Sequence, residues 1–381
     1  IPYEINKNGN YTFKITAEGT QNTKTVNVNV NQYLPESDIT KPYLPGQDFS
    51  YLSGTDVNSG LTTQDGAGNQ YVWIEVPRTG DVYQTAWLNI TNFTDKDYAN
   101  IESDLHEYTS KYRNGTDYVD KYCEDNTSGW FSNDTDYTTA KRKMLKSIYE
   151  NGGFYIGKHE AGISKFRTEP GNATEIPSSK ANQYPYTFIT RTQAKQLAEK
   201  VNSGGYTSSL MFGIQWDLML AHIQNKGGVD VTTLINDSTN IGNYYNNKWN
   251  VTNDKAKYNE DGTEWKNCPY QKTTETGILL TTGASETFAK MNIYDVAGNV
   301  FEWTLEGKQN ATVVSSTGIR LALLINSKVS PIRLAKASAS GPCVRRGGGY
   351  DLSGTGFPAS DRYGYEVAYS RDDIGFRVTL Y

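Results

Sequence analysis

Three segments of the 381-residue chain carry the apolar spacing of an amphipathic helix, and they stand among short apolar stretches bounded by Gly and Pro. In the clearest of them, Thr190 and Gln193 form a capping-box pair ahead of an apolar stripe over 194–201. The other two lie at about 141–150 and 213–224. A few helices among short strands predict an α+β fold.

The first part of the chain has the period of paired strands. Apolar and polar residues alternate over 11–15 and again over 26–31, and the polar residues 18–22 supply a turn between them. A single hairpin cannot bury a core alone. These strands resemble the last two strands of a bacterial immunoglobulin-like module, so we interpret 1–33 as a partial module and the Pro-containing residues 34–45 as a linker.

The remaining residues, 46–381, are predicted to form one large domain of mixed elements. The apolar runs 71–77 and 153–157 are typical of buried strands. Residues 95–137 are polar, rich in Asp and Tyr and without clear periodicity, which predicts a long surface excursion. Residues 307–341 are richer in Leu, Ala and Ser than their surroundings, and we expect an inserted loop or a short helix there.

Charge and hydropathy narrow the range of partners. The chain has 37 basic and 42 acidic residues, a net charge of −5 and no basic run, so we expect no nucleic-acid partner. Its longest apolar run, 319–325, is far shorter than the roughly 20 residues that span a bilayer, so we expect no membrane insertion. The chain starts at Ile1 without a signal peptide, and we interpret it as a fragment of a longer protein. The oligomeric state leaves no signal in the sequence.

Cysteine and histidine are too sparse to predict a metal or nucleophilic centre. Cys123, Cys268 and Cys343 lie far apart with no CxxC pair, which excludes a disulfide scaffold and a cysteine-rich zinc site. The odd number leaves at least one free thiol, while a Cys123–Cys268 bond or another pairing stays open. The histidines are isolated and have no ligand spacing. They are His106, His159 and His222.

Three stretches carry a family resemblance. Residues 292–304 read NIYDVAGNVFEWT, residues 346–350 read RGGGY, and residues 373–378 read DIGFRV. In this order they resemble the signature of the formylglycine-generating-enzyme-like (sulfatase-modifying-factor) domain, and earlier pieces of the chain match it as well, so that the resemblance spans 46–381. The matching earlier pieces are 71–77, 153–162 and 215–217. The resemblance implies an elaborated C-type lectin fold for this domain.

The family contains enzymes and binding proteins, and two positions separate them. The oxidase members resemble RGGSY followed by two cysteines that bind copper and perform the chemistry. Here those positions hold Leu352 and Phe357, which can neither bind a soft metal nor form a disulfide. We therefore expect no enzymatic activity and no required cofactor. Asn299 and Glu302 match positions near a calcium site in the enzyme branch, so the resemblance implies Ca²⁺ there, unless both residues only hold their turn by hydrogen bonds.

The binding branch fits the segment between the last two motifs. Residues 350–373 contain no Lys, Gln, Met, Trp or Asn, although Asn and Lys are common elsewhere in the chain. In this respect the chain resembles the variable proteins of diversity-generating retroelements, in which this segment is rewritten to change the ligand. The resemblance implies a diversified surface that binds a protein or glycan on a cell. The protein would be a phage or prophage receptor-binding protein or a bacterial surface adhesin, located outside the cell, on its surface or on a virion.

The segment 350–373 has the composition of a recognition surface, with rigid aromatic anchors beside adaptable polar groups. The predicted ligand contacts are Tyr350, Asp351, Leu352, Ser353, Thr355, Phe357, Asp361, Tyr363, Tyr365, Tyr369 and Asp372. The alternative for each aromatic is a core residue beneath a loop. For the whole protein the alternatives are a degenerate oxidase with another centre and an inert structural module with a lectin fold.

Overall fold

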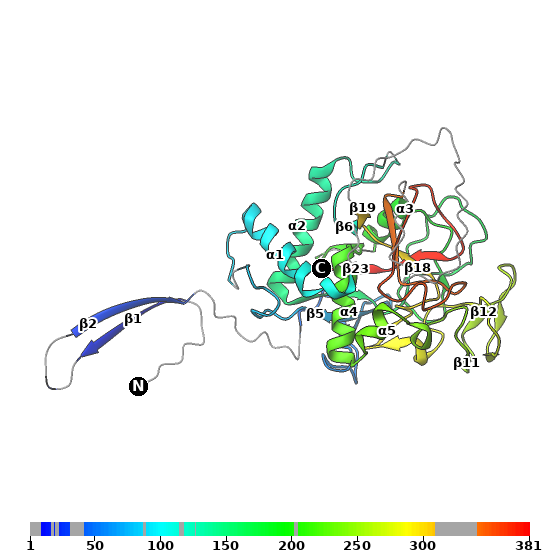
Figure 1. Ribbon diagram of the computed structural model, residues 1–381, viewed down its shortest axis with the longest axis horizontal. Helices are drawn as coiled ribbons and strands as arrows, with labels where there is room; N and C mark the ends of the chain where they lie inside the picture. Colours follow the sequence, from blue (N-terminus) through cyan, green and yellow to red (C-terminus); the bar gives the residue numbers. More distant parts are fainter. Residues whose placement is uncertain are drawn as a thin grey trace, which may run out of the picture.

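The computed structural model describes residues 9–16, 19, 23–30, 42–86, 89–113, 118–125, 127–201, 205–308 and 341–381. Within them the fold is mixed α+β, with several small sheets and few helices, as the sequence predicts (Figure 1). The α-helices are α1 (Asp95–Tyr108), α2 (Asp134–Asn151), α3 (Arg191–Glu199), α4 (Gly213–Gly227) and α5 (Val231–Ile235). Short 3-10 helices span Ser110–Tyr112, Thr239–Ile241 and Glu286–Phe288.

Helices α2, α3 and α4 match the predicted ones. The Thr190 hydroxyl accepts a hydrogen bond from the Gln193 backbone N–H at 3.3 Å, and the Gln193 side chain accepts one from the Thr190 N–H at 3.1 Å, so the capping box starts α3. Helix α2 begins earlier than predicted, after its cap Asn133, and ends at Gly152, whose φ of 72° is left-handed. Helix α4 buries its predicted inner face, Trp216 included.

The prediction of a surface excursion over 95–137 is wrong, because the stretch contains all of α1 and the start of α2. Thr94 caps α1, and Ile101 and Leu105, four residues apart, are its buried apolar residues. Asp104 is also buried and accepts hydrogen bonds from the backbone of a preceding loop. Tyr98 and Tyr108 also pack against the core, so residues 98, 101, 105 and 108 do have helical spacing, and the prediction missed this stripe among the many polar residues between them.

Two sheets organise the chain from residue 50 onward. The larger has six strands in the order β10 (Ser208–Leu210), β23 (Val378–Leu380), β7 (Gly153–Gly157), β5 (Gln70–Glu75), β4 (Thr62–Gln64) and β3 (Ser50–Tyr51). The second has the order β21 (Arg362–Tyr365), β20 (Cys343–Arg346), β18 (Phe301–Trp303) and β22 (Ile374–Phe376). Strands β5 and β7 confirm the predicted buried strands. Only Arg377 separates β22 from β23, so the closing motif joins the two sheets.

The other strands form small sheets. These pair β11 (Trp249–Val251) with β14 (Tyr270–Lys272), β16 (Ala289–Lys290) with β17 (Ile293–Tyr294), β19 (Gly307–Lys308) with β6 (Tyr118–Val119), and β8 (Gly162–Ile163) with β9 (Tyr184–Pro185). A three-stranded sheet has the order β13 (Lys266–Asn267), β12 (Lys257–Asn259) and β15 (Leu279–Leu280).

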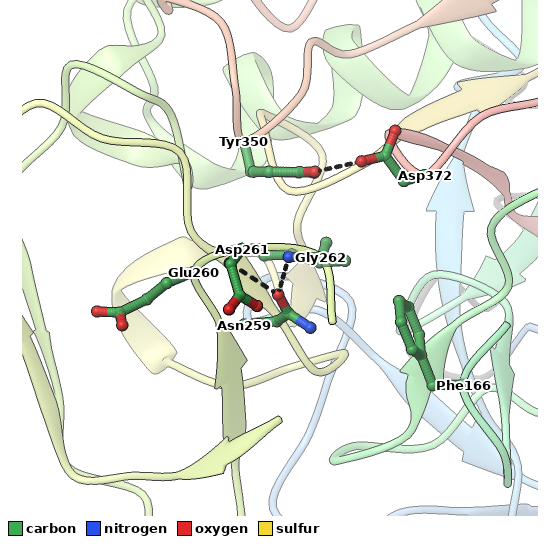
Figure 2. A pocket seen from close by; sticks show the side chains of 8 residues that line it. Phe166, Asn259, Glu260, Asp261, Gly262, Tyr350 and Asp372 are labelled. Atoms are coloured by element: carbon green, nitrogen blue, oxygen red, sulfur yellow. Dashed lines mark hydrogen bonds between the residues drawn. The ribbon is translucent and has the colours of Figure 1, made fainter. Parts of the chain in front are cut away.

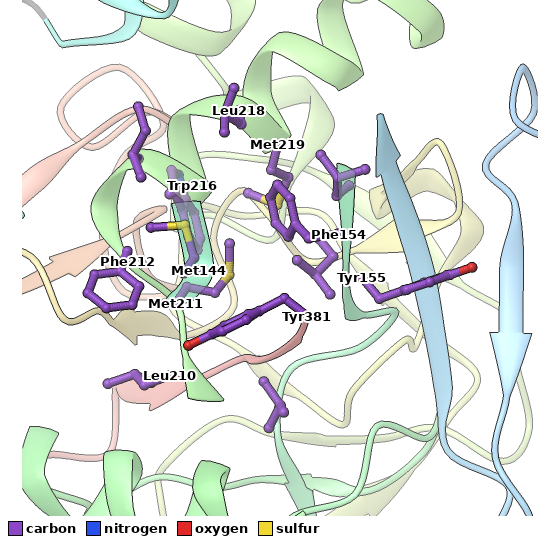
Figure 3. Packing of buried hydrophobic residues seen from close by; sticks show 14 of the residues in the cluster. Met144, Phe154, Tyr155, Leu210, Met211, Phe212, Trp216, Leu218, Met219 and Tyr381 are labelled. Carbon is purple, nitrogen blue, oxygen red and sulfur yellow. The ribbon is translucent and has the colours of Figure 1, made fainter. Parts of the chain in front are cut away.

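The main core lies between α4 and the six-stranded sheet. Trp216 and Met219 of α4 pack near Phe154 of β7 and the side chain of Tyr381 (Figure 3). A smaller core of buried apolar residues forms around Trp249. These two cores fix the positions of the elements that surround residues 350–373.

The N-terminal strands form a hairpin as predicted. Strands β1 (Gly9–Thr16) and β2 (Thr23–Val30) are antiparallel, with Phe13 opposite Val26, and form a two-stranded sheet of their own. The assignment of 1–33 to a partial immunoglobulin-like module, of 34–45 to a linker and of 46–381 to one domain stays a prediction. The predicted loop or helix over 307–341 falls, apart from its ends, outside the described residues.

The three thiols of Cys123, Cys268 and Cys343 are free and buried, so the disulfide pairing left open by the sequence does not form. Among the described residues, the longest apolar stretches of helix fall short of what would cross a membrane.

Candidate functional site

The segment 350–373 is built on the strand pair β20 and β21. Arg346 lies opposite Arg362, and the two strands run antiparallel. Along β21, Arg362 and Gly364 are buried whereas Tyr363 and Tyr365 are only partly buried. The two-residue period of a strand therefore points one set of side chains into the molecule and the other set outward.

The inward side of this strand pair ends in a buried charge cluster, formed by Asp217, Glu306, Arg346, Arg362 and Arg113. Arg346 lies 2.8 Å from Asp217 and 3.3 Å from Glu306, and Arg362 lies 2.9 Å from Glu306 and also pairs with Asp217. Arg113, on the rim, lies 3.1 Å from Asp217. Burial acts to raise the pKa of Asp217, but the guanidinium groups outweigh it and the pKa is lowered, so this carboxylate is ionised.

The outward side carries a tyrosine cluster, formed by Tyr363, Tyr365 and Tyr369. The rings of Tyr365 and Tyr369 are stacked with centroids 3.9 Å apart, and the Tyr363 ring lies 5.0 Å from that of Tyr365. The guanidinium of Arg345 lies 4.6 Å from the Tyr365 ring centroid and 3.3 Å from that of Phe301. Three partly exposed rings on a rigid cationic support resemble the aromatic anchors of binding surfaces.

A pocket of about 180 Å³ lies where the segment meets the turn 259–262 (Figure 2). Tyr350 and Asp372 form one wall, and Phe166 and the buried Leu279 lie elsewhere around it. The Tyr350 hydroxyl donates to the Asp372 carboxylate at 2.9 Å. Burial and the neighbouring Asp372 raise the pKa of Tyr350 above its ordinary value, so the hydroxyl keeps its proton.

The loop between Tyr350 and β21 carries the remaining predicted contacts. They are Asp351, Leu352, Ser353, Thr355, Phe357 and Asp361, of which Thr355 is exposed and the others are partly buried. The backbone is fixed from below, since the Leu352 carbonyl accepts from the Tyr245 N–H at 2.8 Å. Four predicted contacts also pack against the main core, so for them the interpretation as residues beneath a loop holds in part. They are Leu352, Phe357, Tyr365 and Tyr369.

The structure thus brings five of the eleven predicted contacts together in two groups, Tyr350 with Asp372 at the pocket and the tyrosine cluster on β21 and beyond. The six loop residues join neither group, and for Asp361 the backbone shows why. Its backbone carbonyl instead accepts a hydrogen bond from Arg346 at 2.9 Å.

Cys343 lies beside this segment, directly opposite Tyr365 in the strand pair. It is fully buried, and burial raises the pKa of its thiol to about 12, so the sulfur stays protonated. Such a thiol is neither a nucleophile nor a soft metal ligand.

Asn299 and Glu302 do not fit a calcium ion as they lie in the structure. Both Glu302 carboxylate oxygens accept from Arg377, at 2.7 and 3.1 Å. The Asn299 oxygen accepts from the Leu280 N–H, and its nitrogen donates to Glu160 at 2.7 Å. Within the described part of the chain, no group of three His, Cys, Asp or Glu side chains is arranged to hold a metal ion. The interpretation in which these residues hold their turn through hydrogen bonds matches the contacts better.

The far wall of the pocket was not predicted from the sequence. It consists of the turn 259–262, which follows β12, and of Phe166. The Asp-Gly pair at 261–262 is a turn signal in the sequence, but the sequence does not tell which segment the turn faces.

Comparison with known proteins identifies no family and a solved structure of low similarity. No family model matches the chain, and no curated protein matches it. Among solved structures, the chain is similar to Treponema denticola variable protein 1, with 16% sequence identity and a TM-score of 0.31, over 60% of this chain and 84% of that one.

Proposed function

We propose that the protein is a non-catalytic ligand-binding protein that displays residues 350–373 as a diversified surface, in the manner of the variable proteins of diversity-generating retroelements. Its ligand is a macromolecule on a cell surface, and the protein acts as a phage or prophage receptor-binding protein or as a bacterial surface adhesin. In this proposal residues 46–381 have the elaborated C-type lectin fold that the sequence resemblance implies.

The observation that carries the proposal is the division of side chains along the segment. Positions that point inward, such as Arg362 and Gly364, are buried in fixed contacts, while the predicted ligand contacts Tyr363, Tyr365 and Thr355 reach the surface. A surface of this kind can change its outward residues without disturbing the core. This arrangement supports a scaffold for variable recognition.

The absence of cysteine at the positions of the family's copper ligands supports a role without catalysis. Those positions hold Leu352 and Phe357, and the nearest thiol, Cys343, is buried and protonated. A copper-loading and peptide-oxidation assay that returned turnover would favour a degenerate oxidase instead.

Binding to a panel of bacterial cells tests the proposal. We expect at least one strain to retain the fluorescently labelled protein, and Tyr363→Ala combined with Tyr369→Ala to weaken retention by about tenfold or more, because buried aromatic anchors dominate such interfaces. Tyr51→Ala, which truncates a tyrosine that is 37% exposed outside the segment, is the matched control and should leave retention unchanged. Full binding by the double variant would contradict the proposal and support the alternative of an inert structural module.

Diversification has its own test in the genome. We expect a reverse transcriptase gene near this coding sequence, with a template copy of codons 350–373 that differs only at adenines. A template that differs at other bases, or none at all, would contradict this part of the proposal.

A further inference from the structure

The pocket beneath Tyr350 contains a buried hydrogen-bond donor without a partner. Asn259 is 2% exposed, and its side-chain nitrogen makes no hydrogen bond to any described residue. Its oxygen accepts from the backbone N–H groups of Asp261 and Gly262, at 3.1 and 2.5 Å. Because both of those groups are donors, the orientation of the amide is fixed with the oxygen toward the turn.

The free nitrogen of Asn259 therefore points away from the turn. Figure 2 shows it on the side of the pocket where Phe166 lies. A buried donor left without an acceptor is costly, and such groups in native proteins call for an explanation. A ligand atom that accepts a hydrogen bond would satisfy this one.

The carboxylates around the pocket already have partners. Glu260 lies 2.9 Å from Lys266, and Asp372 accepts from Tyr350 and lies 3.6 Å from Arg371. Asp261 accepts from the backbone and hydroxyl of its own turn, which lowers its pKa. The acidic rim is thus largely compensated, although the side chains of Glu260 and Asp372 remain 37% and 33% exposed and can accept further hydrogen bonds.

The unpaired Asn259 nitrogen and the carboxylates around the pocket favour some chemical classes of ligand over others. A guanidinium or ammonium group only donates, so it cannot satisfy the Asn259 nitrogen. A carboxylate would accept from that nitrogen, but it would lie among Glu260, Asp261 and Asp372, which repel it. A hydroxyl group both accepts and donates, so a polyhydroxylated ligand can meet Asn259 and a rim carboxylate at once.

The aromatic walls and the size of the pocket fit a ring with an apolar face. Phe166 is held edge-on by Trp265, with ring centroids 5.1 Å apart, and Tyr350 lies on the other wall. The volume of about 180 Å³ is below the roughly 300–1,000 Å³ of sites for drug-sized molecules, so it suits one ring-sized group.

We propose that this pocket binds a single uncharged sugar residue of a glycan, with the Asn259 nitrogen donating to one of its oxygens and Asp372 accepting from one of its hydroxyls. This inference rests on the proposed ligand-binding function and names the chemical class of the ligand. It adds a wall outside the segment 350–373, formed by the turn 259–262 and Phe166, to the binding surface.

The test uses NMR of the whole chain with three kinds of probe: methyl glycosides of neutral hexoses and N-acetylhexosamines, N-acetyl-arginine amide, and acetate. The side-chain amide signal of Asn259 is identified by its absence from the spectrum of Asn259→Asp. We expect at least one glycoside to shift this signal saturably with a Kd on the order of 1 mM, and the other two probes to leave it in place.

Asn259→Asp keeps the oxygen that holds the turn and replaces the donor with a further carboxylate oxygen. It should weaken glycoside binding by about tenfold, whereas it would strengthen binding of a cationic ligand, so the sign of the change separates the two classes. Asn250→Asp, the same change at an exposed position outside the pocket, is the control and should have no effect. Phe166→Leu, which keeps an apolar side chain but removes the ring, should also weaken glycoside binding.

The inference is overturned if no glycoside shifts the Asn259 signal, if the arginine amide or acetate binds instead, or if Asn259→Asp binds glycosides as well as the parent. Cell retention that depends on Tyr363 and Tyr369 while no glycoside binds would refute the sugar pocket and leave the proposed function standing. Glycoside binding in the pocket, together with cell retention that does not change when those tyrosines are replaced, would refute the proposed function of the segment and leave the sugar pocket standing.

Discussion

The division between inward and outward positions on β21 can be tested by replacing neighbours that point in opposite directions. Arg362→Met removes an inward guanidinium that pairs with Asp217 and Glu306 and donates to the Tyr112 carbonyl at 2.7 Å. Tyr363→Ala truncates the next, outward residue, whose ring touches that of Tyr365.

Breaking a buried ion pair by removing one partner destabilises a protein by about 3–5 kcal/mol, because a charge is left buried without compensation. Here Arg346 and Arg113 still flank Asp217 after the substitution, which places the expected loss near the lower end. With an unfolding entropy of about 2.1 cal/mol/K per residue, a loss of about 3 kcal/mol in a unit of roughly 340 residues lowers Tm by about 4 °C. Tyr363→Ala should cost less than about 1 kcal/mol, since it removes one partly exposed ring contact.

Urea unfolding followed by tryptophan fluorescence, with Tm from calorimetry, measures both losses. The pKa of Asp217 lies below its ordinary value of 3.8, so the stabilisation from this carboxylate is present above that pH and is lost as the pH falls through the folded-state pKa. The difference between the parent and Arg362→Met should therefore shrink below about pH 4. Equal losses for the two variants, or a loss below about 1 kcal/mol for Arg362→Met, would refute the division of β21 into buried inward positions and outward surface positions.

Three further substitutions test the fold that supports the site. Thr94→Ala removes the side chain that caps α1 with Asp97 and should cost about 1 kcal/mol in urea unfolding, with Thr94→Ser nearly neutral. Gly348→Ala places a Cβ 2.4 Å from the Phe357 carbonyl oxygen at a φ of 80° and should cost about 2 kcal/mol or more, measured the same way. Burial raises the pKa of Asp120 from 3.8 to about 7, so the folded chain holds this proton more tightly and its stability falls as pH rises across that window. Asp120→Asn does not titrate, and its unfolding free energy should depend less steeply on pH there.

The features that could be read from the sequence are those fixed by nearby residues. The capping pair Thr190 and Gln193 lies within one turn of helix, and the apolar runs of β5 and β7 are buried on both faces, so each pattern is complete in a short window. In helix α1 the apolar stripe 98, 101, 105 and 108 is present, but half of it is only partly buried and the polar Asp104 is buried beside it. A carboxylate buried through hydrogen bonds to another loop leaves no apolar signal in the sequence.

The candidate site divides in the same way. The sequence singles out the segment 350–373, but it predicts neither strand β21 nor that Arg362, rather than Tyr363, lies on the buried side of it. The partners of Arg362 come from α4 and from Glu306, far away in the chain, and nothing near Arg362 indicates them. Tyr350 likewise meets the turn 259–262 only through tertiary packing.

If residues 350–373 are diversified as proposed, the position of the pocket has a consequence for which ligands the variants bind. One wall, with Tyr350 and Asp372, belongs to the segment proposed to vary, while Asn259 and Phe166 lie outside it. The far wall, which contains the oriented amide donor of Asn259, is then constant among variants of the segment. Each variant would keep the requirement for an acceptor at Asn259 and alter only the contacts around it. Diversification of 350–373 should therefore change which glycan is bound more readily than whether a hydroxylated ring is bound. We therefore expect Asn259→Asp to weaken glycoside binding in every variant of this chain that differs at Tyr350 and Asp372. Variants that bind glycosides independently of Asn259 would contradict this division of roles.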